Sequence, residues 1–99
     1  MAEIKTSFPA FYVDDLLDGD HPPGAFKFYA NEAGEIIGMN AVMPFNNEQG
    51  KQLATFPFTA KHKHHWQWDG NREKPTLSPS LHLPGHWHGY LRGGEFKSV

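Results

Sequence analysis

The sequence predicts an all-β or mainly β protein: a small single domain built as an antiparallel sheet or sandwich of hairpins. Apolar and polar residues alternate along short segments such as "AFKFYA", so that every second side chain would face a core. Turn signatures rich in Gly and Asn separate these segments. Three of the eight prolines fall between residues 75 and 84, which excludes a helix there.

The chain of 99 residues is long enough for one domain, which we place at residues 24–99. Residues 1–23 are expected to form an N-terminal arm. Its apolar residues have rough helical spacing and are followed by Gly19 and two prolines, which predicts a short helix or an irregular arm. The acidic residues of this arm lack the ligand order of an EF-hand, so calcium binding is not expected.

Two hairpins frame the predicted β domain. The segments "AFKFYA" and "EIIGMNAVMPF" would pair across a turn at residues 31–34. Near the end of the chain, "HWHGYL" would pair with "EFKSV" across Gly93 and Gly94, and Trp87 would face the core. Residues 53–58 predict a short edge strand, because Pro57 cannot donate to a ladder. An exposed edge of this kind could support a homodimer.

Between the hairpins lie two segments with contrasting patterns. If residues 61–71 form a strand, His62, His64, Trp66 and Trp68 share one face of it. The proline-rich residues 72–85 predict an extended loop rather than a central strand. Long loops of this kind are often functional.

Composition limits the function classes. The chain has no cysteine, so disulfides and thiolate zinc sites are excluded. Neither a signal peptide nor a membrane-spanning apolar run is visible, so we expect a cytoplasmic protein of a bacterial host or a phage-infected cell. Residues 61–99 carry six basic side chains against three acidic ones, but no nucleic-acid motif accompanies them. The expected partner is a protein or a small molecule, not a membrane or a nucleic acid.

Histidines are the strongest candidates for chemistry. His86 and His88 would point to one side of a strand about 6.6 Å apart, a spacing from which two imidazoles can reach one ion. The ion would be a divalent transition metal such as zinc, nickel or iron. The candidate ligands are His62, His64, His82, His86 and His88.

Serine catalysis has less support, because Ser78 and Ser80 lack the glycine-flanked turn that usually exposes a catalytic serine. A contact in space between a serine and a histidine nevertheless stays open. We also expect a binding face of aromatic, hydroxyl and charged side chains. Its residues are Trp66, Trp68, Asp69, Thr76, Ser78, Ser80, Tyr90 and Arg92. The sequence therefore favours a non-enzymatic binding or interaction module. The alternative is a histidine-ligated metal protein or small metalloenzyme that uses His86 and His88.

The stretch "WQWDGNREKPTLSPSL", together with "HGYLRGG", resembles a family of small bacterial and phage proteins, many of them labelled "ammonia monooxygenase". The shared pattern covers about residues 66–94: a Trp-containing strand, an Asp/Asn-Gly turn, Glu-x-Pro-Thr-Leu-x-Pro-Ser, and a His-containing hairpin. In many members the resemblance implies a zinc site held by cysteines on the first hairpin and just before the histidine. Here "YANEAGEI" and Trp87 stand at those positions, so the resemblance supports the fold and argues against a structural zinc.

Overall fold

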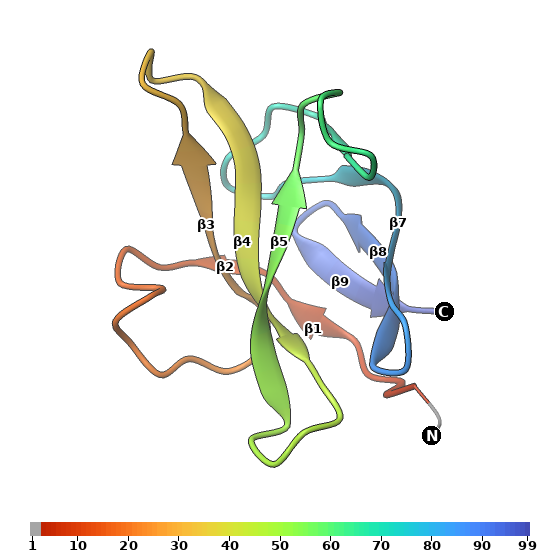
Figure 1. Cartoon of the computed structure of the whole chain (residues 1–99). Helices are drawn as coiled ribbons and strands as arrows, with labels where there is room; N and C mark the ends of the chain where they lie inside the picture. Colours follow the sequence, from red (N-terminus) through yellow and green to blue (C-terminus); the bar gives the residue numbers. More distant parts are fainter. Residues whose placement is uncertain (1–2) are drawn as a thin grey trace.

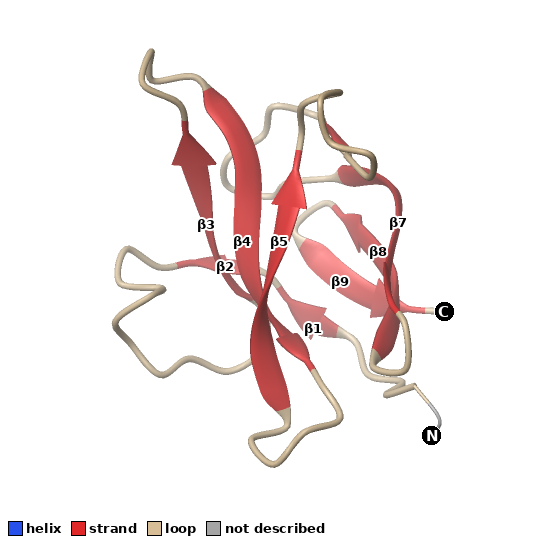
Figure 2. Ribbon diagram, viewed as in Figure 1, coloured by secondary structure: helices blue, strands red, loops and turns tan. Residues whose placement is uncertain are grey.

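The described residues, 3–99, form two β-sheets in the computed structural model of the chain (Figures 1 and 2). The first sheet has the order β1-β9-β8-β7-β6, with bounds β1 Phe8–Pro9, β9 Glu95–Ser98, β8 Trp87–Arg92, β7 Leu77–Leu83 and β6 Gln67–Trp68. The second has the order β2-β3-β4-β5, with bounds β2 Phe11–Tyr12, β3 Ala25–Ala30, β4 Ile36–Pro44 and β5 Lys51–Pro57. The predicted mainly β fold is confirmed. These residues contain no helix, and thus none long and apolar enough to cross a membrane.

The core lies between the two sheets, because each contributes one apolar face. The second sheet buries Phe26, Met39 and Phe56 completely or nearly so, and the first sheet does the same with Trp87 and Phe96. Burial of side chains of this size is the main stabilising contribution to a small sandwich. The predicted core position of Trp87 is confirmed.

The N-terminal segment joins the sheets instead of forming a helix. β1 pairs antiparallel with β9 in the first sheet, and β2 pairs parallel with β3 in the second, so the second sheet is mixed. Between them, the N–H of Ala10 donates to Gly94 O at 2.9 Å and the N–H of Phe11 donates to Gly24 O at 2.9 Å. The helical alternative for this arm is therefore wrong. Each sheet gains one short strand from the segment.

Both predicted hairpins are present. β3 and β4 pair antiparallel around residues 31–35, and β8 and β9 pair around Gly93 and Gly94. Both of these glycines have positive φ angles, 56° and 78°, as a tight primed turn requires. β5 lies at an edge of its sheet, as Pro57 predicted.

Two predictions for the middle of the chain are wrong. The proline-rich segment contains a strand, β7, which lies between β6 and β8. Pro79 is tolerated because it falls at a shift in register between Leu77 and Leu81, where the ladder does not need its missing N–H. Conversely, the strand considered for residues 61–68, before a turn at residues 69–71, is limited to Gln67–Trp68. Residues 61–65 are all exposed and form turns, because they offer no apolar side chain to a core.

Candidate active site

Ser80 lies in an irregular part of β7. Leu77 pairs with Leu91 and Leu81 pairs with Gly89, so three residues of β7 stand opposite a single residue of β8. Such bulges bend a strand and redirect its side chains, and they are common beside active sites. The indole N–H of Trp66 donates to the carbonyl oxygen of Ser80 at 3.2 Å, which holds the backbone of the bulge in place.

His88 faces Ser80 from the neighbouring strand. Its Nε2 atom is 3.4 Å from Ser80 Oγ, and both side chains are half-buried. Contacts between a catalytic serine and its base are often this long before substrate binds. A hydroxyl beside an imidazole nitrogen is the arrangement that a serine nucleophile and a general base require.

The alternation of β8 explains why His88 points outward. Trp87, Gly89 and Leu91 face the core, so His88 and Tyr90 must face the opposite side of the sheet. Gly89 is required here, since a Cβ atom on it would lie 2.1 Å from Lys97 O and 2.5 Å from the ring of Trp87. The large indole of Trp87 thus fills the space beside Gly89 on the core side and anchors the strand that carries His88.

A hollow of about 510 Å³ adjoins Ser80. One part of its lining comes from the loop before β6, with Lys63, His64 and His65, and another from β7, with Ser80 and His82. None of the described residues that line it is acidic. The hollow is large enough for several side chains of a peptide and offers them cationic or titratable neighbours.

The sequence model of the BubE family, described as the serine protease of a bacterial ubiquitination-like system, matches residues 27–99. The chain belongs to the BubE family. The match includes Ser80 and His88, and it leaves out the N-terminal segment with β1 and β2. No curated protein and no solved structure matches the chain.

The BubE-family match makes the serines stronger candidates for catalysis than the sequence alone did. Catalysis by Ser80 had less support in the sequence because no glycine flanks it, but this serine reaches its position through a bulge rather than a tight turn between a strand and a helix. A signal was present in the sequence: Pro79 precedes Ser80, and proline inside a strand pattern indicates an edge or a bulge. What the sequence could not supply was the partner, because the pairing of β7 with β8 shifts at this point.

Two of the predicted metal ligands lie together, and they are joined by an acid that the sequence analysis did not select. His82 Nε2 is 2.8 Å from Glu3 Oε2, and the rings of His82 and His88 have centroids 4.5 Å apart. One ligand atom each of Glu3, His82 and His88 lies within 4.8 Å of the other two. The hydrogen bond from His82 is the main cause that lowers the pKa of Glu3, and the charge of His88 adds to it.

The other three predicted ligands lie elsewhere. His86 Nδ1 accepts the N–H of Asn46 at 3.0 Å, and its ring lies against Phe45 with centroids 4.3 Å apart. His62 and His64 belong to the exposed loop at residues 61–65, and only His64 lines the hollow beside Ser80. The five histidines predicted as ligands therefore do not converge on one point, and metal binding by this set stays a prediction.

Six of the eight residues of the predicted binding face divide into two groups. Ser80, Tyr90 and Arg92 lie on the outward side of the first sheet, where the guanidinium carbon of Arg92 is 4.2 Å from the ring centroid of Tyr90. Ser78 is exposed in the same bulge. Trp66 and Trp68 turn inward instead and pack against the core.

Asp69 and Thr76 belong to neither group, since both tie down the loop between β6 and β7. An oxygen of Asp69 accepts the N–H groups of Asn71 at 3.0 Å and Thr76 at 3.2 Å. The hydroxyl oxygen of Thr76 accepts the N–H of Gly93 at 2.8 Å, which connects this loop to the last hairpin. Both residues therefore act structurally in this arrangement.

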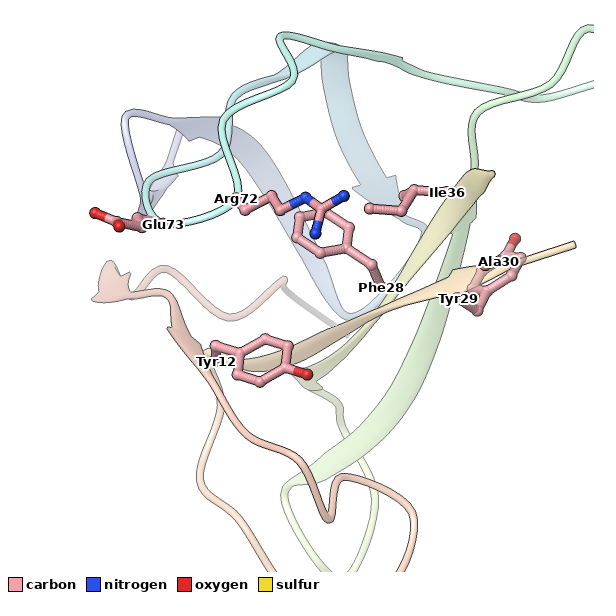
Figure 3. Close-up of a pocket in the computed structure, with 7 residues that line it drawn as sticks. All are labelled: Tyr12, Phe28, Tyr29, Ala30, Ile36, Arg72 and Glu73. Atoms are coloured by element: carbon pink, nitrogen blue, oxygen red, sulfur yellow. The ribbon is translucent and has the colours of Figure 1, made fainter. Parts of the chain in front are cut away.

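A second hollow, of about 460 Å³, shares no lining residue with the first. Figure 3 shows Arg72, from the loop after β6, extending toward Phe28, whereas the side chain of Glu73 points away from that ring. Neither a serine nor a histidine is among its described lining residues. We therefore place the candidate active site at Ser80 and not here.

Proposed function

We propose that this BubE-family chain is a serine protease with Ser80 as nucleophile and His88 as general base, acting in a bacterial ubiquitination-like system. The proposal rests on one observation above all, the 3.4 Å approach of Ser80 Oγ to His88 Nε2 on an outward sheet face. The family description supports the same reaction class. It takes the place of the non-enzymatic module that the sequence favoured.

The chemistry follows from these two side chains. Ser80 Oγ attacks the carbonyl carbon of the substrate while His88 Nε2 takes the hydroxyl proton. The tetrahedral intermediate collapses when the bond to the leaving group breaks, and the imidazolium returns its proton to that group. Water then attacks the acyl ester of Ser80 with His88 again accepting a proton, and the product acid leaves as Ser80 is reprotonated.

The hollow beside Ser80 is the proposed binding site for the substrate. Trp66 and Pro79 offer apolar contact, whereas Lys63 and three histidines offer positive or titratable groups. A polypeptide that lies in this hollow would carry its scissile carbonyl past Ser80. The proposed substrate is a polypeptide that is cleaved at an amide or ester bond. The family description suggests that this polypeptide is a ubiquitin-like protein.

A fluorophosphonate reagent tests the nucleophile directly. It loses fluoride when an activated serine oxygen attacks phosphorus, and the adduct is located by tandem mass spectrometry. We expect one adduct, on Ser80, that disappears in Ser80→Ala. Rate loss in His88→Ala should be about 10²- to 10⁴-fold, the usual contribution of a general base.

Ser78→Ala is the matched control, because Ser78 lies in the same bulge, is more exposed and has no contact with His88 among the described hydrogen bonds. Labelling of this variant should equal that of the unchanged protein. An adduct on Ser78, or equal labelling of Ser80→Ala and the unchanged protein, would refute the assignment.

A further inference from the structure

The cluster of Glu3, His82 and His88 combines two imidazoles and one carboxylate on one side of the first sheet. These are the ligand types that zinc and related divalent ions prefer in the absence of cysteine. Glu3 lies outside the residues that match the BubE family, so the cluster is a feature that the family match does not describe.

The distances suit a metal ion with small adjustments. Around zinc, ligand atoms at 2.0–2.1 Å from the ion lie about 3.3 Å from each other in a tetrahedron. In the structure the three ligand atoms are within 4.8 Å of one another, and the pair from Glu3 and His82 is 2.8 Å apart. An ion would replace the proton of this hydrogen bond, with shifts of about 1 Å or less per side chain.

The backbone already holds the three ligands in place. His82 and His88 are direct partners in the register of β7 and β8, which brings their side chains together on one face. Next to Glu3, the N–H of Ile4 donates to His86 O at 2.7 Å. A little further on, Thr6 O accepts the indole N–H of Trp87 at 2.9 Å. The N-terminal segment is thus fixed along the start of β8, and little ordering remains for an ion to impose.

We propose that Glu3, His82 and His88 form a binding site for a divalent transition metal, best suited to zinc, and that the bound ion inhibits the Ser80–His88 pair. A neutral imidazole has one nitrogen with a free lone pair. When the metal takes that lone pair, the other nitrogen carries the proton and cannot accept one from Ser80, whichever nitrogen binds the ion. The binding half of this inference is independent of the proposed function, whereas the inhibition rests on it.

The test begins with zinc binding to tag-free protein, freed of metal with EDTA and then dialysed, measured by isothermal titration calorimetry. We expect one zinc ion per chain. Glu3→Gln and His82→Ala should each weaken zinc binding by about tenfold or more. Loss of a group that only hydrogen-bonds to a metal ligand already costs about tenfold in affinity, and loss of a ligand should cost at least as much. The matched control replaces His62, His64 and His65 by Ala, which removes the histidines of the exposed loop at residues 61–65 and leaves the cluster intact.

Fluorophosphonate labelling of Ser80, with and without one equivalent of zinc, tests the second half. Zinc should suppress labelling of the unchanged protein and EDTA should restore it, whereas labelling of His82→Ala should persist in zinc. Loss of zinc binding in the loop variant, or unchanged binding in both Glu3→Gln and His82→Ala, would overturn the site. Tight zinc binding that leaves labelling unaffected would overturn the inhibition alone, and absence of labelling in EDTA would overturn the proposed function while the site stands.

Discussion

The chain has two histidine-rich regions that resemble each other in sequence and differ entirely in structure. His82 and His88 lie on neighbouring strands and face each other in register, close to Ser80 and Glu3. The loop at residues 61–65 is richer in histidine, yet its side chains are exposed and held mainly by local turns, such as the 3.1 Å contact of His65 Nδ1 with His62 O. The number of histidines in a segment therefore does not bring imidazoles together, whereas the pairing of β7 with β8 does.

The largest contrast between the two regions should appear in serine reactivity. His88→Ala removes the only imidazole that contacts Ser80 among the described hydrogen bonds, and should slow fluorophosphonate labelling about 10²- to 10⁴-fold. Replacement of His64, which lines the same hollow, should change the rate less than about threefold, since a general base must be within hydrogen-bond reach. Comparable losses in both variants would mean that the hollow, and not the contact in the sheet, activates Ser80.

The strand that carries His88 depends on Trp87, whose side chain is fully buried. Trp87→Ala should lower the free energy of unfolding by about 3–5 kcal/mol, the usual cost of removing a large aromatic side chain from a core. Urea denaturation followed by circular dichroism measures this loss. Trp87→Phe keeps most of the buried apolar area and should cost clearly less, and a smaller loss for the alanine variant would show that the indole is not a main support of β8.

Acid should reduce the free energy of unfolding through the protonation of Glu3. The pKa of Glu3 is lower in the folded chain, so the carboxylate stabilises folding above its unfolded pKa of about 4.3, and this contribution is lost as pH falls through the folded value. The melting temperature of Glu3→Gln should thus be lower than that of the unchanged protein near neutral pH, and the difference should vanish in acid. Glu48→Gln, in the exposed loop after β4, is the control and should show no such pattern. A difference that is constant across pH would argue against the contact between Glu3 and His82.

The smallest effect is expected in the loop. Replacement of His62, His64 and His65 by Ala changes only exposed side chains, and should alter the free energy of unfolding by about 0.5 kcal/mol or less. The same urea titration provides the measurement. A loss above 1 kcal/mol, which is about what a well-made hydrogen bond contributes, would show that the loop packs more firmly than its turns indicate.

The sequence predictions were most accurate for features that depend on residues close together in the chain. The hairpins at β3–β4 and β8–β9 were predictable because alternation and turn residues act over a few neighbours. The strand β7 was missed, because three prolines in the segment argued against a ladder and the register shift that accommodates Pro79 involves a distant strand. For the loop at residues 61–65 the local pattern suggested a strand, but no apolar side chain was available to bury there.

The amino-acid order was sufficient for the β class, for the inward position of Trp87 and for the exclusion of thiolate chemistry, since each depends on residue type or on alternation along one strand. The contact of Ser80 with His88 and the approach of Glu3 to His82 depended on the pairing between strands. Such contacts join residues up to 79 positions apart in the chain. Their register is set by the packing of the whole sandwich, because a shift by one residue would turn each side chain to the opposite face.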